Sequence, residues 1–140
     1  MAIPTKILLE VVTPDRALIR EEVDEIQLPG SEGYLGVLPG HSPLLTSLKV
    51  GELWYRSGAE KQYLAIAGGF VEILPERVTV LAQIAERAED IDIRRAEAAK
   101  QRAEERLARP APDVDFARAR IALMKSLIRL QVASRARTRV

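Results

Sequence analysis

The sequence changes character near residue 90, and this change constrains the fold more than any other feature. Up to about residue 85, short apolar runs recur, and proline, glycine or aspartate closes each of them. This rhythm is typical of short strands in a sandwich or barrel. From Asp90 onward alanine, arginine and glutamate dominate, all strong helix formers. The sequence therefore predicts a β unit over residues 1–86 and a helical unit over residues 87–140.

The apolar runs locate the expected strands of the first unit. Leu-Pro-Gly tripeptides at 28–30 and 38–40 end strands, and Gly68-Gly69 separates two others. The expected strands are Lys6–Val12, Val23–Leu28, Leu53–Arg56, Tyr63–Ala67, Phe70–Leu74 and Val78–Leu81.

Two helices are expected in the second unit. The first runs over Ile93–Ala108, with Asp92 as the N-cap that accepts hydrogen bonds from the first turn. A Pro-Ala-Pro segment at 110–112 ends it, because proline cannot continue a helix. The second helix runs from about Val114 to Ser134, and either aspartate of the preceding Asp-Val-Asp segment can cap it. Two helices joined by so few residues form a helical hairpin.

Apolar stripes indicate the buried faces of this hairpin. The first helix carries a small-residue stripe of Ala96, Ala99, Ala103 and Leu107. The second helix carries two stripes, one of Phe116, Ala119, Leu123, Leu127 and Leu130 and one of Ile121, Met124, Ile128 and Val132. One stripe covers the first helix, and the other needs the sandwich or a partner protein. Because a short hairpin holds little core, we expect it to dock reversibly.

The charges divide between the two parts of the chain. Met1 to Ile93 holds 8 basic and 15 acidic residues, a balance of −7, and Arg94 to Val140 holds 13 basic and 5 acidic residues, a balance of +8. Arg118, Lys125 and Arg129 line one edge of the second helix, which is either a solvated face or a site for an anion or an acidic protein.

A nucleic-acid partner is not expected, although the last six residues include Arg135, Arg137 and Arg139. The basic part of the chain has one aromatic residue, Phe116, and so offers no platform on which bases could stack. An acidic protein surface is the simpler partner.

Catalytic and metal chemistry are not expected either. The chain has no cysteine, so it has no thiolate ligand, disulfide or cysteine nucleophile. His41 is the single histidine, which makes a transition-metal site improbable. The glycines between Gly30 and Gly40 are not followed by Gly-Lys-Ser or Gly-Lys-Thr and therefore suit β turns rather than a phosphate loop. Neither a targeting peptide nor a membrane span is expected.

Two segments carry a resemblance to a known family. They read LPGSEGYLGVLPGHSPLLTSLKVGEL from Leu28 and AIAGGFVEILPERVTVLA from Ala65. Both resemble the epsilon subunit of the F-type ATP synthase. This resemblance implies a ten-stranded β-sandwich followed by a C-terminal antiparallel two-helix hairpin. It also implies a non-catalytic subunit in the rotating central stalk of a proton-translocating enzyme.

The resemblance further implies partners and a location. The sandwich would bind the gamma subunit and the c-subunit ring, with Ser31, Glu32 and His41 at the end that faces the ring. The helices would reach the alpha and beta subunits and inhibit ATP hydrolysis. The chain would lie at the cytoplasmic side of the cell inner membrane as a peripheral component, attached through the complex alone.

A short motif suggests a regulatory ligand. Some members of the family bind ATP through Ile or Leu, Asp, two variable residues, Arg and Ala, and Ile91–Ala96 matches this pattern. Carried over by position, the ATP-binding residues would be Glu86, Asp92, Arg95, Lys125 and Arg129. The ATP-binding members have arginine where this chain has Lys125, which lacks the bidentate fork. No cofactor is required, and ATP would act as a signal.

An alternative hypothesis is a free-standing nucleotide sensor, a β-sandwich whose helical lid closes on a nucleotide. Co-purification with gamma would separate the two hypotheses.

Overall fold

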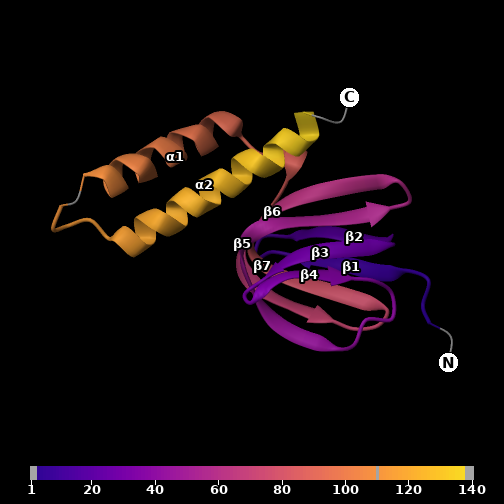
Figure 1. The fold of residues 1–140 in the computed structure, drawn as a ribbon. Coiled ribbons are helices and arrows are strands. Elements are labelled where there is room, and N and C mark those ends of the chain that lie inside the picture. The colour runs from indigo at the N-terminus through magenta and orange to yellow at the C-terminus, as the bar shows by residue number, and fades with distance from the viewer. Residues whose placement is uncertain (1–2, 110, 138–140) are drawn as a thin grey trace. The chain divides into compact units, whose positions relative to one another are not determined.

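The computed structural model describes residues 3–109 and 111–137. The chain divides into two compact units, Met1–Glu86 and Arg87–Val140 (Figure 1). The elements of the first unit are β1 (Ile7–Val12), β2 (Ala17–Val23), β3 (Glu25–Gly30), β4 (Gly33–Val37), β5 (Leu44–Ser57), β6 (Glu60–Ile73) and β7 (Arg77–Arg87). The elements of the second unit are the short 3-10 helix η1 (Ala88–Asp90), α1 (Ile93–Ala108) and α2 (Phe116–Arg137).

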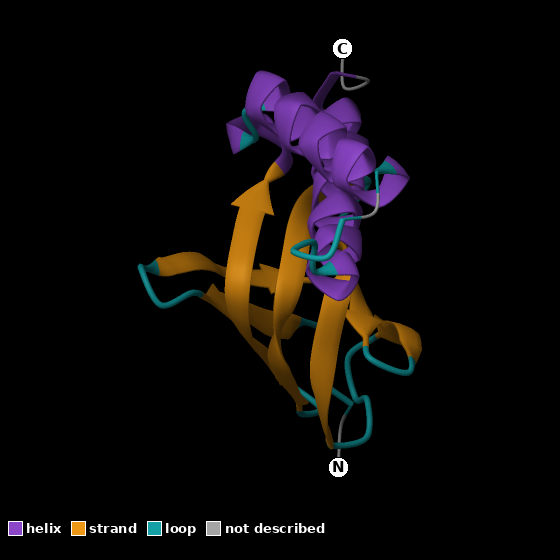
Figure 2. Cartoon of the chain, turned by 90° about the vertical axis from the view of Figure 1, so that its left-hand side faces the viewer, coloured by secondary structure: helices purple, strands orange, loops and turns teal. Residues whose placement is uncertain are grey.

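The seven strands form one sheet that wraps around a single core. Their order is β2-β1-β7-β6-β5-β3-β4, and β1 pairs with β7 in parallel. Every strand contributes apolar side chains to the same cluster, and β2 contacts β5 although the two are not neighbours in the sheet. Figure 2 shows strands of the first unit crossing one another at two levels. This arrangement confirms a β-sandwich followed by two helices.

The two longest strands, β5 and β6, each change their core-facing side near the middle. Each strand therefore contributes buried side chains to both layers of the sandwich. In β5 the buried Leu48 and Leu53 are five residues apart, and in β6 the buried Ile66 and Val71 are also five apart. Because adjacent side chains alternate between faces, an odd separation means that the core-facing side has switched. The glycine pair at 68–69 permits this in β6, with φ of +77° and +120°.

The predicted count of ten strands is not confirmed, since the sheet contains seven. The segments Tyr63–Ala67 and Phe70–Leu74 are predicted as separate strands, but the first segment and residues 70–73 of the second belong to the continuous β6, and Leu74 follows its end. The two glycines between them turn the strand over without reversing the chain. The sequence alone does not distinguish these two uses of glycine, because both require positive φ.

The predicted strand Val23–Leu28 is wrong as a single element, because Asp24 separates β2 from β3. The Asp24 carboxylate accepts hydrogen bonds from the Lys6 ammonium at 2.6 Å and from the Gly58 amide at 2.7 Å. Arg56 lies 3.8 Å from the same carboxylate. The hydrogen bond from Lys6 and then that from Gly58 lower the pKa of Asp24 below its usual 3.8. This network holds the β2–β3 corner against the β5–β6 turn.

The helices follow the capping signals closely. The predicted bounds of α1 are confirmed, and Asp92 caps it by accepting a hydrogen bond from the amide of Arg95 at 3.2 Å. α2 begins after Asp115, whose carboxylate accepts from the amide of Arg118 at 3.1 Å. Of the residues singled out from the sequence, Pro110 and Arg139 lie outside the described ones.

The face on which the two helices meet is narrower than the predicted stripes. α1 and α2 pack on each other, and their buried small residues recur every seven positions, Ala96 and Ala103 on α1 and Ala119, Ser126 and Ala133 on α2. Seven residues are nearly two helical turns, so this spacing keeps one line of each helix toward its neighbour. Small side chains bring the backbones close, which leaves larger ones outside the contact. Four members of the predicted stripes are exposed in the chain alone, Phe116 and Leu127 of one stripe and Ile121 and Met124 of the other. Neither stripe therefore covers α1 along its whole length, and the expectation that one of them meets the sandwich or a partner protein stays a prediction.

Candidate functional site

The loop predicted to face the ring lies at one end of the sandwich. Ser31 and Glu32 form the exposed turn between β3 and β4. The Ser31 amide donates to the Ser47 carbonyl at 2.9 Å, and the two serine hydroxyls lie 2.7 Å apart. These bonds hold the turn against β5. Ser31 and Glu32 are therefore presented together on a braced turn.

His41 lies in the next loop and is held separately. Its Nδ1 lies 2.7 Å from the carbonyl oxygen of Ser42, and the preceding amide of Gly40 donates to the Pro75 carbonyl at 2.8 Å. Within residues 3–109 and 111–137, no hydrogen bond joins His41 to Ser31 or Glu32. Ser31 and Glu32 therefore share one turn, and His41 lies in a different loop.

A shallow hollow adjoins the β3–β4 turn. It has a volume of about 370 Å³ and is lined by Gly30, Glu32, Gly33, Tyr34, Leu35, Leu44, Leu45 and Thr46. The Tyr34 hydroxyl accepts a hydrogen bond from the Glu52 amide at 3.1 Å, which fixes the ring at the wall. Tyr34 is not among the residues predicted from the sequence, although tyrosine is enriched at protein interfaces.

The outer surface of the sandwich carries an apolar patch, which we define as Leu45, Phe70 and Leu81. These side chains are 71%, 58% and 55% exposed and point away from the core. They lie on β5, β6 and β7, which are adjacent in the sheet. Leu45 pairs with Glu72 and Ser47 with Phe70, so Leu45 and Phe70 are diagonal neighbours on one face. An exposed group of large apolar side chains is typical of a protein contact surface.

The residues predicted to hold ATP divide between the two units. Glu86 is in β7, at the end of the first unit. Asp92 and Arg95 lie at the start of α1, where Asp92 serves as the N-cap. Lys125 and Arg129 lie one turn apart on α2, both half-buried. The structure therefore places four of the five on two helices that pack together, and the Asp92 carboxylate already has a structural partner.

The part of the chain that the structure describes lacks two other kinds of feature. In the described part of the chain, no three His, Cys, Asp or Glu side chains gather in a way that could hold a metal ion. No described helix has both the length and the apolar character needed to cross a membrane.

The fold and its surfaces define a class of protein, a β-sandwich with an exposed apolar patch joined to a helical hairpin. Residues 6–88 match the family "ATP synthase, Delta/Epsilon chain, beta-sandwich domain", and residues 89–134 match "ATP synthase, Delta/Epsilon chain, long alpha-helix domain". The chain belongs to this family, the delta/epsilon chains of ATP synthase.

Individual relatives agree with the family assignment. The ATP synthase epsilon chain of Solibacter usitatus is 49% identical over 94% of this chain and 98% of its own length. That of Syntrophobacter fumaroxidans is 50% identical over 93% of this chain and 97% of its own length. The predicted function, a non-catalytic subunit of ATP synthase, is confirmed. The alternative of a free-standing nucleotide sensor is set aside, because these relatives are subunits of a complex.

Solved structures show the same fold. A chain of the Euglena gracilis mitochondrial ATP synthase, in a structure of OSCP, F1 and c-ring, superposes with a TM-score of 0.80 at 27% identity, over 98% of this chain and 84% of that one. A chain from the central stalk and c-ring of the Tetrahymena thermophila mitochondrial ATP synthase superposes with a TM-score of 0.58 at 15% identity, over 98% of this chain and 100% of that one.

Proposed function

We propose that this chain works in the central stalk of a proton-translocating, bacterial-type ATP synthase. Its sandwich binds the gamma subunit and rests on the c-subunit ring, and its hairpin restrains ATP hydrolysis by contact with the alpha and beta subunits. The chain is then a peripheral component at the cytoplasmic side of the cell inner membrane, held there through the complex. The relative from Euglena, whose structure includes F1 and a c-ring, supports attachment through such a complex.

The observation that carries the sandwich's role is the apolar patch of Leu45, Phe70 and Leu81. A patch that spans three adjacent strands is costly to leave in water, at roughly 25 cal/mol for each Å² of apolar surface. The gamma subunit is the partner that would cover it. The braced Ser31-Glu32 turn, together with His41, supports a second and more polar contact with the ring.

The test is co-purification of gamma with the variant Phe70→Glu. A carboxylate in the middle of an apolar contact must be desolvated without a partner, so we expect at least a tenfold loss of gamma binding. The matched control is Ile3→Glu, which adds the same charge at a residue that is 74% exposed and lies in the segment before β1. Equal gamma recovery with Phe70→Glu and with the unaltered chain would contradict the proposal.

The hairpin's proposed regulation involves ATP as a signal rather than a substrate. Asp92 and Arg95 from α1 and Lys125 and Arg129 from α2 would hold the nucleotide, with Glu86 as a fifth contributor. The support is that these four residues lie on two packed helices, so that a ligand between them favours the folded hairpin. The +8 balance of the segment from Arg94 onward supports an acidic surface on the catalytic subunits as the competing partner.

A further inference from the structure

The sheet of the first unit ends in two edge strands of different character. β2 and β4 are its outermost strands, and within the described residues each pairs with a single neighbour, β1 or β3. β2 carries the exposed charges Arg20, Glu21 and Glu22, and charged side chains on an edge oppose pairing with another chain. β4 has the sequence Gly-Tyr-Leu-Gly-Val and carries no charge. It therefore lacks the protection that β2 has.

The register of β3 and β4 shows which backbone groups of β4 face outward. In an antiparallel pair, residues that exchange two hydrogen bonds alternate with residues that exchange none. Pro29 pairs with Tyr34 and has no N–H to donate, so this pair is of the second kind. The pair of Gln27 with Gly36 lies two residues further along and is of the same kind. The N–H and C=O groups of Tyr34 and Gly36 therefore point away from β3.

The side chains of β4 hold the strand in place without covering this edge. Val37 is fully buried, and Leu35 packs against the core cluster. The Tyr34 hydroxyl accepts from the Glu52 amide at 3.1 Å. Among the described residues, none beyond the adjacent ones would lie within 4 Å of a Cβ atom at Gly36. β4 is thus a fixed and open edge, to which an extended segment of another chain can add as a strand.

The hollow beside the β3–β4 turn connects this edge to the apolar patch. Its lining includes Tyr34 and Leu35 of β4 together with Leu45, which belongs to the patch. Glu32 is the single charged residue of the lining. The hollow therefore suits an apolar side chain, and a partner that covers the patch can continue across it to β4.

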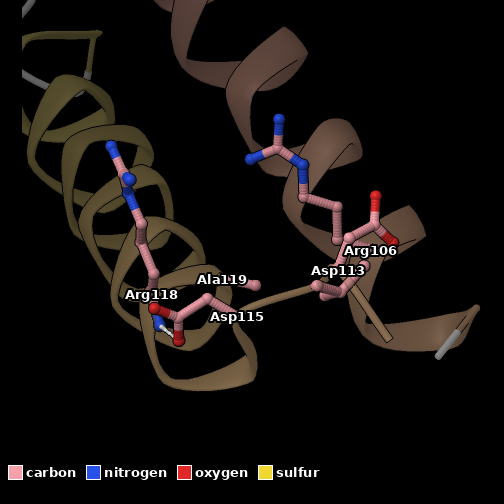
Figure 3. A pocket seen from close by; sticks show the side chains of 6 residues that line it. Arg106, Asp113, Asp115, Arg118 and Ala119 are labelled. Carbon is pink, nitrogen blue, oxygen red and sulfur yellow. Dashed lines mark hydrogen bonds between the residues drawn. The ribbon is translucent and has the colours of Figure 1, made fainter. Parts of the chain in front are cut away.

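The hairpin offers no comparable surface among its described residues. The backbone groups inside α1 and α2 are hydrogen-bonded within each helix. The hollow at the hairpin turn is lined by Arg106 and Arg118 together with Asp113 and Asp115, so its charges balance (Figure 3). An extended segment is therefore expected to bind the first unit.

We propose that β4 accepts an extended segment of the gamma subunit as an eighth strand, with an apolar side chain of that segment in the hollow. This strand addition rests on the proposed contact of gamma with the patch and adds main-chain hydrogen bonds to it. The N–H groups of Tyr34 and Gly36 donate to the segment, and their C=O groups accept from it. A second copy of the chain is a poorer occupant, because five residues span about 17 Å. So short an edge does not bury the roughly 1,000 Å² that a stable interface needs.

The test is co-purification of gamma with the variant Gly36→Pro. Proline removes the outward N–H of residue 36 and preserves the pairing of β4 with β3, because that N–H does not donate to Gln27. We expect about a tenfold loss of gamma binding, from one missing hydrogen bond and the carbonyl of the partner that is left unpaired. Gly36→Ala is the matched control, since it keeps the N–H and its Cβ has open space. It should bind gamma as the unaltered chain does.

The outcomes separate the edge from the patch. Equal gamma binding by Gly36→Pro and Gly36→Ala would overturn the strand addition, whereas a loss with Phe70→Glu alone would leave the patch contact standing. A loss with Gly36→Pro and none with Phe70→Glu would support the edge and contradict the patch. Sedimentation of the isolated chain tests the other occupant. A dimer that Gly36→Pro abolishes would assign β4 to a second copy and overturn the proposal.

Amide hydrogen exchange on the unaltered chain gives a decision even where Gly36→Pro lowers the melting midpoint. In the isolated chain the amides of Tyr34 and Gly36 should exchange quickly, while the amide of Leu35, which faces β3, is protected. Binding of gamma should slow exchange at Tyr34 and Gly36 at least tenfold, because both amides then donate hydrogen bonds. Unchanged exchange at these two amides in a complex that contains gamma would overturn the proposal.

Discussion

Asp24 shows how one carboxylate can fix the geometry of a sheet. It joins Lys6, Arg56 and the Gly58 amide, and so connects three segments that are distant in sequence. Its pKa is lowered chiefly by the hydrogen bond from Lys6. A carboxylate with a lowered folded-state pKa stabilises the fold above its unfolded pKa, and this contribution disappears as the pH falls through the folded value.

We therefore expect Asp24→Asn to lower the thermal unfolding midpoint of the chain at pH 7. The difference from the unaltered chain should shrink as the pH falls below the usual aspartate pKa of 3.8, because the native carboxylate then becomes protonated too. The measurement is the melting midpoint between pH 7 and pH 3. Asp15→Asn, at an exposed residue in the β1–β2 turn, is the control and should show no such trend. A difference that grows toward acid pH would refute this account of the corner.

At the scale of secondary-structure elements, local signals predicted the helices better than the strands. Asp92 fixes the start of α1 through a hydrogen bond within one turn, so sequence alone sufficed. Gly68-Gly69 could either end β6 or switch its core-facing side. The neighbouring strands β5 and β7 decide between these two outcomes, and a local sequence pattern contains no information about them. The same limit applies to the candidate site. The turn position of Glu32 could be predicted, whereas Tyr34 was missed because the Glu52 amide that holds its hydroxyl lies on another strand.

The narrow contact between the helices gives a prediction for the hairpin. Ala103 is 1% exposed and lies on the line where α1 meets α2, so Ala103→Leu should overpack it. We expect a destabilisation of the hairpin of about 1 to 3 kcal/mol. Ala98→Leu places the same side chain on an exposed face of α1 and is the control.

Amide hydrogen exchange over residues 93–137 measures this effect. Exchange in α1 and α2 should accelerate in Ala103→Leu and not in Ala98→Leu, while the core strands of the first unit keep their protection. Unchanged exchange in Ala103→Leu would mean that the two helices do not depend on this contact.

ATP binding by the hairpin gives a second prediction at this scale. In calorimetric titrations of the full chain, we expect Arg95→Ala to weaken ATP binding at least tenfold, because the contact is charge-assisted. Lys125→Arg should strengthen it severalfold by supplying the bidentate fork. Arg94→Ala alters a variable position of the motif and is the control. No binding at millimolar ATP would mean that the motif only starts α1, through the Asp92 cap.

At the scale of the whole molecule, the two units carry opposite charge and different kinds of surface. The sandwich has a firm core drawn from all seven strands and an exposed apolar patch, which suits a constant contact in a rotor. The two helices of the hairpin pack on each other along a narrow line of small residues. A contact of this kind suits an element that has more than one docked arrangement. Coupling should therefore depend on the first unit and inhibition on the second.

The most direct measurement compares ATP synthase assembled with the full chain and with a chain that lacks residues 90–140. Proton-driven ATP synthesis and ATP hydrolysis are measured on both complexes, with gamma content as the control for assembly. We expect the truncated chain to keep gamma and to support synthesis, while hydrolysis rises severalfold. Equal hydrolysis by the two complexes would contradict an inhibitory hairpin, and loss of gamma from the truncated complex would contradict the assignment of rotor binding to the sandwich.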